Sequence, residues 1–460
     1  MEDGKPQDLT VLEDVFETIT SFEWLERAYR NARKQKRYRP EVLAFGDNLD
    51  AHLLGVQRRL RDGTFIFGPY RRHWVYVPKH RLVMALPFAS RIVQWAIYQL
   101  LNPFYDKQMI EDSYACRAGK GSLAAVRRLQ YWLRLIRRKP GDWYYLKLDI
   151  SKYFYRIDHS ILMGILRRRI RDERLLELLD NIISHGGEKF GLPRFATPEE
   201  TPEEEWLPDV GMPIGNLTSQ LFANIYLNEL DQYCKHALHI RYYIRYMDDV
   251  IILTEGKERA REYLRMIREF LLDRLHLDLN RKTAVRPAGT PIEFVGYIAT
   301  AKRLRLRKST TRRIKRAFRA ICRRYFAGGM SAEDFRRRVA SYEGMMAHCQ
   351  SGNLRKRLND IFIREREAAK TNHIQVIGEL CEICSKQANI IYQQSVILAE
   401  VGVVSETLDA EIAEARERYV AVTETARGRE TLSGKGGRPR PLSEREGMTN
   451  GRQFCGTPGV

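Results

Sequence analysis

The chain has 460 residues, 44% of them hydrophobic, and a formal net charge of +20 at pH 7. This length allows about two or three domains with a sizeable core. The charge predicts a polyanionic partner, most often nucleic acid, and a basic surface kept for solubility is the alternative. There is no run of about 18 apolar residues and no apolar core near the start, so we expect no membrane span and no secretory leader. Seven scattered cysteines are typical of the reducing cytoplasm, where we expect the protein to be located.

Apolar periodicity and turn residues predict a mixed α+β fold. In chain order we expect helices in 21–60, a strand pair at 70–77 and 81–86, helices at 91–101 and 123–136, a strand at 143–150, a helical stretch at 161–183, an exposed Pro- and Glu-rich insertion at 186–210, a helix at 217–238, a hairpin, a helix at 257–275 and a short strand at 292–298.

The last third of the chain combines helical patterns with positive charge. Residues 302–324 contain many Lys and Arg and no acid, and their apolar residues recur at helical spacing. They predict a basic amphipathic helix that either grips phosphates or is merely solvated. Helical segments are expected to continue to residue 366, followed by two amphipathic stretches at 371–400 and 405–426. The Gly-, Arg- and Pro-rich residues 427–460 are predicted to be disordered.

Two adjacent acids, Asp248 and Asp249, lie between the apolar, β-prone runs 240–245 and 250–253. This pattern predicts a β-hairpin with the acids at its bend. A third acid, Asp149, ends an apolar strand, and the three carboxylates converge if the strands are neighbours in one antiparallel sheet. Mg²⁺ prefers oxygen ligands, and two such ions can clamp the attacking and leaving oxygens of a phosphoryl transfer. The alternative is a solvated turn, where Asp is common.

Seven segments, in their order and spacing, resemble bacterial reverse transcriptases, and are most like those of diversity-generating retroelements. They are PKHRLVMALPFASRIVQ (78–94), SYACRAGKG (113–121), LKLDISKYFYRIDH (146–159), GMPIGNLTSQLFANIYLNELD (211–231), RYMDDVIIL (245–253), LNRKT (279–283) and FVGY (294–297). The resemblance implies a bacterial or phage-encoded RNA-directed DNA polymerase that copies an RNA template into cDNA from dNTPs, with two Mg²⁺ ions as cofactors.

The resemblance also implies the right-hand arrangement of fingers, a palm with an antiparallel sheet, and a helical thumb. The expected boundaries are an N-terminal tail at 1–20, fingers with the start of the palm at 21–140, a palm at 141–300, a thumb at 301–368, a helical extension at 369–426 and a disordered basic tail at 427–460.

Roles of single residues follow from their positions in the matching motifs. Catalysis and metal binding are implied for Asp149, Asp248 and Asp249, with the main-chain oxygen of Ile150 as a further ligand. Nucleotide binding is implied for Lys79 and Arg81 (triphosphate), Arg91, Phe154 (the gate against a 2′-hydroxyl), Ile214, Gln220 and Lys282 (protonation of pyrophosphate). Template–primer binding is implied for Tyr246, Met247, Gly296, Tyr297, Arg312, Lys315, Arg316 and Arg319. Ordinary alternatives are surface charge for Lys79 and Arg81, a salt-bridged surface lysine for Lys282 and core packing for Phe154.

Two differences between this sequence and other reverse transcriptases bear on which subfamily it resembles. Ile214 stands where retroviral and group II intron enzymes usually carry Gln, and Ser219–Gln220 resembles the diversity-generating signature. In that subfamily an aliphatic residue here is associated with infidelity at template adenines, and simple packing of Ile214 is the alternative. The residues after the thumb are the second departure, because diversity-generating enzymes usually end soon after it.

The expected function is therefore error-prone cDNA synthesis in a diversity-generating retroelement. The alternative within the same chemistry is a defence-associated reverse transcriptase that acts against phage with a noncoding RNA. A catalytically silent RNA-binding scaffold is the alternative of a different class. The C-terminal helices are expected to bind a helper protein or a structured RNA, or to self-associate.

Overall fold

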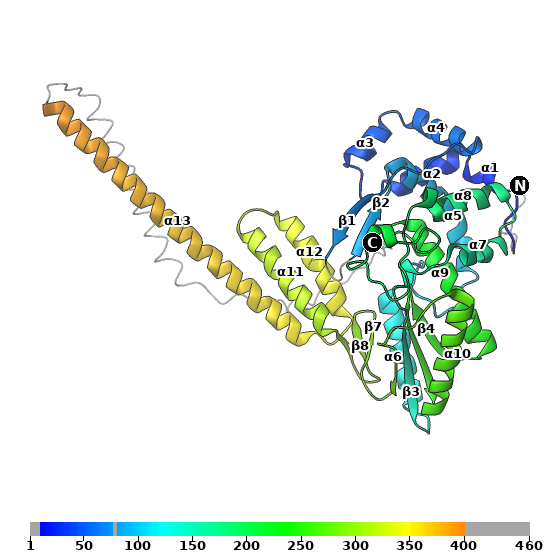
Figure 1. Ribbon diagram of the computed structural model, residues 1–460. Coiled ribbons are helices and arrows are strands. Elements are labelled where there is room, and N and C mark those ends of the chain that lie inside the picture. The colour runs from blue at the N-terminus through cyan, green and yellow to red at the C-terminus, as the bar shows by residue number, and fades with distance from the viewer. Residues whose placement is uncertain (1–9, 77–80, 401–460) are drawn as a thin grey trace, which may run out of the picture. The chain divides into compact units, whose positions relative to one another are not determined.

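The protein is described by a computed structural model, which covers residues 10–76 and 81–400 (Figure 1). The chain forms two compact units, Met1–Ala317 with Arg336–Arg357 and Phe318–Phe335 with Leu358–Val460. No described helix is both long enough and apolar enough to cross a membrane.

The N-terminal part of the first unit is helical. Ser21 caps its second helix by accepting a hydrogen bond from the Trp24 amide (3.3 Å), and Pro40 opens the third helix, where its missing N–H has no partner to lose. The elements are α1 (Phe16–Ile19), α2 (Phe22–Ala32), α3 (Pro40–Gly46), α4 (Leu49–Arg61), the antiparallel strands β1 (Arg71–Val75) and β2 (Arg81–Ala85), α5 (Phe88–Asp106) and α6 (Ser122–Ile136).

A four-stranded antiparallel sheet follows, with the strand order β4-β5-β3-β6. Its strands are β3 (Trp143–Asp149), β4 (Tyr242–Tyr246), β5 (Asp249–Glu255) and β6 (Ala284–Pro287). The helices between them are α7 (His159–Arg167), α8 (Glu173–Ser184), α9 (Leu217–Gln232), which ends in a π-helical turn (Tyr233–Ala237), and α10 (Lys257–Leu275). Short 3-10 turns occupy Tyr153–Tyr155, His185–Gly187 and Glu203–Glu205.

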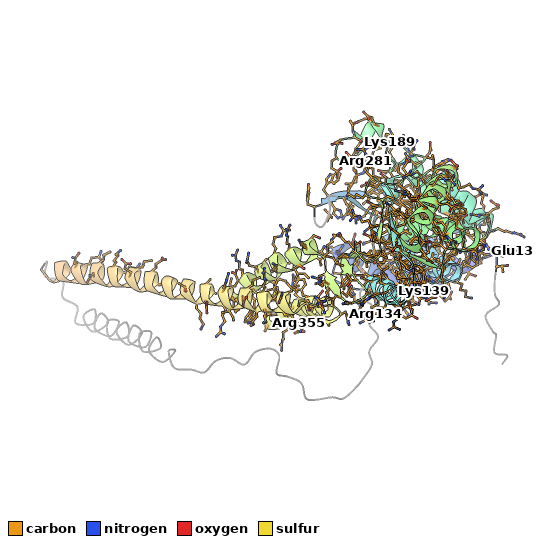
Figure 2. The ribbon with its side chains drawn as sticks, turned by 90° about the horizontal axis from the view of Figure 1, so that it is seen from below. Glu13, Arg134, Lys139, Lys189, Arg281 and Arg355 are labelled. Atoms are coloured by element: carbon orange, nitrogen blue, oxygen red, sulfur yellow. The ribbon has the colours of Figure 1, made fainter. Side chains whose placement is uncertain are left out.

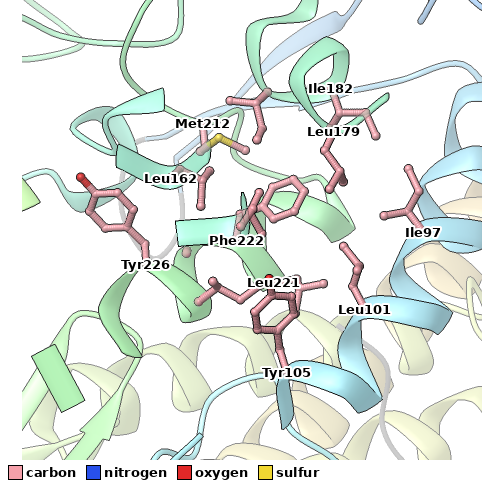
Figure 3. Close-up of a cluster of buried hydrophobic side chains, with 14 of the residues drawn as sticks. Ile97, Leu101, Tyr105, Leu162, Leu179, Ile182, Met212, Leu221, Phe222 and Tyr226 are labelled. Atoms are coloured by element: carbon pink, nitrogen blue, oxygen red, sulfur yellow. The ribbon is translucent and has the colours of Figure 1, made fainter. Parts of the chain in front are cut away.

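Both faces of this sheet are covered, as its nearly continuous apolar strands require. One face joins a core built from α5, α7, α8, α9 and α10, part of which is shown in Figure 3. There Ile97 and Leu101 of α5 lie near Leu179 of α8 and Phe222 of α9. The other face packs against α6 and a small sheet of β7 (Ile292–Phe294), β8 (Tyr297–Ala299) and β9 (Leu304–Leu306).

Alternation along the strands decides which face carries the acids, because successive side chains point to opposite sides. Leu146 and Leu148 of β3 belong to the helical core, whereas Tyr145 belongs to the core on the other face. Asp149 shares the parity of Tyr145 and therefore lies on the face of α6 and the small sheet. The same reasoning applies to Asp249, which alternates with Val250 of the helical core.

The second unit is held together by aromatic side chains. Phe335 stacks on Tyr325 with ring centroids 4.5 Å apart, and Phe362 lies 5.2 Å from Phe326 and 6.0 Å from Phe335. The helices that supply these rings are α11 (Lys308–Phe326), α12 (Ala332–Ala347) and α13 (Gly352–Glu400). All three helices also contribute residues to the first unit.

The structure corrects the predicted C-terminal boundaries. The basic helix begins at Lys308 and not at 302, because Leu304–Leu306 forms β9. Helix α13 continues without a break across residue 369, which was expected to start a separate extension. The predicted stretch 405–426 and the tail 427–460 lie outside the described residues.

Three further predictions were wrong in detail. The strand expected at 292–298 is a hairpin, since Gly296 has a φ of 85° and lets the chain reverse between β7 and β8. Part of the tail expected at 1–20 is packed, with Phe16 and Ile19 buried. The insertion at 186–210 is not wholly exposed, because Phe190 and Trp206 are buried against β2 in a cluster of apolar side chains. The apolar residues of this Pro- and Glu-rich segment are scattered and follow no helix or strand period, so the sequence does not predict their burial.

Candidate active site

The hairpin that carries Asp248 and Asp249 has the tight turn that the sequence predicts. Tyr246 pairs with Asp249, which leaves Met247 and Asp248 as a two-residue connection between β4 and β5. Met247 has a φ of 52°, in the left-handed region that costs a residue with a side chain about 1–3 kcal/mol. Surrounding contacts must therefore hold this turn in place.

The third carboxylate is brought to the same place by strand pairing. Asp149, the last residue of β3, is the direct cross-strand partner of Asp249. Directly opposite residues of an antiparallel pair have Cβ atoms about 5 Å apart. The predicted convergence of the strand-end acid with the hairpin acids is confirmed.

The LNRKT segment fixes the end of β3. The amide of Asn280 donates to the carbonyl of Asp149 (2.7 Å), and the amide of Asp149 donates to Oγ1 of Thr283 (3.3 Å). Residue Ile150 is buried and forms a bridge with Leu279. The backbone that presents Asp149 is thus held on both sides.

Charge at this site is unbalanced. The pKa of Asp249 is raised to about 6, mainly by burial and also by the negative charges of Asp248 and Asp149, while Lys147 opposes the increase. Lys147 Nζ lies 3.4 Å from Asp249 Oδ1 and donates a hydrogen bond to the carbonyl of Glu293 in β7 (2.7 Å). Oδ1 of Asp249 is buried without a well-aligned hydrogen bond. Within the part of the chain that the structure describes, Asp249 therefore has two acidic neighbours, Asp248 and Asp149, and Lys147 as an opposing cation.

This donor set suits a hard divalent cation such as Mg²⁺, which binds carboxylate oxygens together with substrate phosphates. Among the described residues, no three His, Cys, Asp or Glu side chains are grouped so that they alone could hold a metal ion. Where substrate phosphates supply part of the ligands, the protein side chains alone need not complete the coordination of the metal. The residues present therefore fit a metal that is bound by protein and substrate together. The unsatisfied Asp249 oxygen is the observation that favours this fit.

Of the residues expected to bind the triphosphate, only one of the basic pair Lys79 and Arg81 lies within the described residues. Lys79 lies outside the described residues, and Arg81 is exposed at the start of β2. Arg91, in the first turn of α5, forms an ion pair with Glu41 of α3 at 2.5 Å and stacks over Phe88. Its guanidinium is therefore engaged within the helical layer.

The segment that contains Ile214 joins β2 to the turn after β3. The carbonyl of Ile214 accepts from the Met84 amide of β2 (2.9 Å), and the Met212 amide donates to the carbonyl of Phe154 (2.7 Å). Both Phe154 and Ile214 are half-buried. The structure therefore links these two predicted nucleotide-binding residues through the backbone of one short segment.

The other two predicted nucleotide-binding residues lie in different surroundings. Oε1 of Gln220 is 3.3 Å from Sγ of Cys116, in the SYACRAGKG segment. Lys282 is exposed, and its amide donates to Oδ1 of Asn280 (3.2 Å). The first contact brings the segments 113–121 and 211–231 together.

The residues expected to bind template and primer occupy the hairpin, the small sheet and α11. The carbonyl of Gly296 accepts from the amide of Arg307 (3.0 Å), and Tyr297 is buried. In the first unit, Arg312 and Arg316 are exposed and Lys315 is half-buried. In the second unit, Arg319 lies 3.5 Å from Glu365.

Exposed cations are not confined to this helix. The basic side chains labelled in Figure 2 come from different parts of the first unit and are all exposed: Arg134, Lys139, Lys189, Arg281 and Arg355. The net charge of the chain is therefore distributed over several elements.

Sequence reasoning missed two basic residues beside the acids. Lys147 shares a strand face with Asp149, two positions away, and strand alternation was the signal. Arg245 is fully buried and forms an ion pair with fully buried Asp231 at 2.6 Å. The signal for Arg245 was its position as a charged residue within a segment whose apolar pattern predicts a buried strand.

Comparison with known proteins identifies the class. Residues 76–299 match the family model of reverse transcriptase (RNA-dependent DNA polymerase). Together with the paired carboxylates of the sheet, this match shows that the chain contains a reverse-transcriptase domain. The match indicates an enzyme, an RNA-directed DNA polymerase, and members of this family act on an RNA template with dNTPs.

Two relatives make the similarity more specific. Protein YkfC of Escherichia coli (strain K12) is 28% identical over 332 residues, covering 62% of this chain and 83% of that protein. The group II intron-encoded protein LtrA of Lactococcus lactis subsp. cremoris is 22% identical over 331 residues, covering 57% of this chain and 51% of LtrA. The chain thus spans about half the length of LtrA. Neither name refers to diversity generation or defence.

Proposed function

We propose that the protein synthesises cDNA on an RNA template with Asp149, Asp248 and Asp249 as the ligands of two Mg²⁺ ions. The observation that carries this proposal is the pairing of Asp149 with Asp249, next to Asp248 in the turn. The main-chain oxygen of Ile150 is the further ligand. When bound, such ions lower the pKa of the primer 3′-hydroxyl and offset charge on the leaving pyrophosphate.

The other groups bind and orient the substrates. The primer 3′-hydroxyl releases its proton to water, and its oxygen forms a bond to the α-phosphorus of the dNTP as the bond to pyrophosphate breaks. Lys79 and Arg81 supply positive charge for the triphosphate, and Lys282 donates a proton to the pyrophosphate. Phe154 lies under the sugar and excludes a 2′-hydroxyl. We assign the predicted fingers, palm and thumb to the helical layer with β1 and β2, the four-stranded sheet, and the C-terminal helices.

Primer extension on an RNA template tests this function. The variants Asp248→Ala and Asp249→Ala are expected to lose activity at least about 100-fold, because each removes a ligand on which transition-state stabilisation depends. Asp273→Ala, on the exposed side of α10, is the matched control and is expected to keep full activity. Equal activity in the wild type and both active-site variants would favour a silent RNA-binding scaffold.

We further propose that synthesis is error-prone and serves a diversity-generating retroelement. The support is Ile214, whose aliphatic side chain offers no hydrogen bond to a nucleotide while its backbone holds β2. Ile214→Gln is expected to lower misincorporation opposite template adenine, measured by sequencing cDNA made from a defined RNA. An unchanged error spectrum would contradict this role.

Antiphage defence with a noncoding RNA is the second candidate. It is favoured by α13, a helix of 49 residues, which is several times longer than the average helix of a globular protein. Sequencing the RNA and cDNA that co-purify with the protein separates the two. In the DNA that flanks the gene, a near-duplicate repeat pair differing at adenines indicates diversity generation, whereas a locus for a structured RNA without such repeats indicates defence.

A further inference from the structure

The turn that carries the catalytic acids is connected to a buried polar network. Arg245, two residues before Met247, is fully buried, as is Asp231 of α9. Its Nε and Nη2 donate to the two carboxylate oxygens of Asp231 at 2.7 and 2.6 Å, a bidentate arrangement. Tyr243 adds a third hydrogen bond to Asp231, at 2.6 Å.

The remaining nitrogen of the guanidinium reaches the turn itself. Nη1 of Arg245 donates to the carbonyl of Met247 (3.3 Å) and to Oδ1 of Asn224 (3.0 Å). Asn224 in turn donates through Nδ2 to the carbonyl of Ala115 (2.9 Å). One rigid planar group therefore joins α9, the segment 113–121 and the residue that precedes Asp248.

We propose that Arg245 is a positioning residue for the catalytic turn, holding the Met247 carbonyl so that Asp248 and Asp249 leave the turn in the arrangement that metal binding requires. The inference rests on the proposed polymerase function. Its physical basis is the left-handed backbone of Met247, which is unfavourable alone and needs a contact of this kind to persist.

The choice of arginine follows from geometry. Its planar fork presents five donors, enough to saturate Asp231 and still reach both Asn224 and Met247. Lysine has the same charge but is a point donor, so it can pair with Asp231 without reproducing the fork. Arg245→Lys thus keeps the charge balance of the core and releases the turn.

Two readouts separate positioning from general stabilisation. The first is the Mg²⁺ concentration that gives half-maximal primer extension by the full-length protein on a homopolymeric RNA template. The second is the rise in Tm that Mg²⁺ causes, because an ion that binds the native state raises Tm according to its affinity. The second readout requires no polymerase activity.

Arg245→Lys is expected to raise the half-saturating Mg²⁺ concentration at least fivefold and to remove most of the Mg²⁺-induced rise in Tm. Asn224→Ala keeps the pair with Asp231, removes one anchor of the guanidinium, and is expected to shift both readouts in the same direction by a smaller factor. If circular dichroism shows that Arg245→Lys does not fold, the two readouts are taken from Asn224→Ala instead.

Tyr243→Phe is the matched control, since it removes a short hydrogen bond from Asp231 but leaves the link to Met247 intact. It is expected to lower Tm in the absence of metal and to leave the Mg²⁺ requirement within twofold of wild type. The inference is overturned if Arg245→Lys and Asn224→Ala need no more Mg²⁺ than wild type, or if Tyr243→Phe shifts the requirement equally. Wild-type protein that never extends a primer refutes the proposed function, while the Tm readout still decides the positioning role.

Discussion

Two aspartates of the same unit, Asp231 and Asp249, each lie beside one basic side chain and behave differently. Both oxygens of Asp231 accept well-formed hydrogen bonds, and no part of its side chain is exposed. Asp249 faces Lys147 at 3.4 Å, retains an unsatisfied oxygen and is 29% exposed. A carboxylate saturated by protein donors is a structural component. One left unsaturated and accessible remains available for a ligand.

The difference arises from the basic partner. The guanidinium of Arg245 donates to both oxygens of Asp231, whereas Lys147 donates its hydrogen bond to the carbonyl of Glu293 and lies 3.4 Å from Asp249 as an ion pair. Asp249 also has acidic neighbours, and Asp231 has a tyrosine hydroxyl instead. The three predictions that follow test this contrast.

The largest effect is expected for the saturated pair. Asp231→Ala leaves the guanidinium of Arg245 buried without its counterion, which costs about 3–5 kcal/mol in the free energy of unfolding. Urea denaturation followed by circular dichroism measures the loss. Glu258→Ala removes a carboxylate from the exposed pair with Arg261 and is the control, with little change expected. A loss no greater than that of the control would show that the pair contributes nothing.

Substitution of Asp249, the unsaturated aspartate, is expected to stabilise the protein, whereas substitution of Asp231 destabilises it. Because the pKa of Asp249 is raised to about 6 from an ordinary 3.8, the folded protein binds its proton more tightly than the unfolded chain does. Stability of the metal-free wild type therefore falls as pH rises from about 4 to about 6. Asp249→Asn removes this penalty and is expected to stabilise the protein by about 2 kcal/mol at pH 8, allowing for partial exposure, and by almost nothing below pH 4.

Denaturation of the metal-free proteins at several pH values checks this dependence. Asp273→Asn, at an exposed position of α10, should follow the wild type at every pH. The same Asp249→Asn variant should be inactive in primer extension, so a gain in stability accompanies the loss of function. A variant that is less stable than wild type at pH 8 would show that Asp249 is a structural residue.

The sequence was sufficient to locate the three acids, because their signals are local. Asp248 and Asp249 interrupt two β-prone runs, Asp149 ends a third, and strand pairing then follows from the antiparallel sheet. Helix α10 was predicted with its observed bounds, since a long amphipathic pattern identifies a helix reliably.

What escaped prediction depends on contacts between distant segments. The partners of Arg245 are Asp231 and Asn224, whose separation in sequence carries no pattern. Packing of Phe16 and of Trp206 likewise depends on surfaces formed elsewhere in the chain. Periodicity predicted one strand at 292–298 because the reversal at Gly296 lies inside a short β-prone segment.

The smallest of the three effects is expected from Lys147→Gln. The substitution removes a cation that opposes the pKa increase of Asp249, so the free-energy cost of ionising this carboxyl group in the folded protein grows. Because both side chains are partly exposed, we expect a loss of about 1 kcal/mol in stability at pH 8 without metal, and little change at pH 4, where Asp249 is protonated. Combining Lys147→Gln with Asp249→Asn should abolish most of this pH-dependent loss, because the charge on which Lys147 acts is gone. Equal losses in the presence and absence of Asp249 would mean that Lys147 acts only through its hydrogen bond to Glu293 in β7.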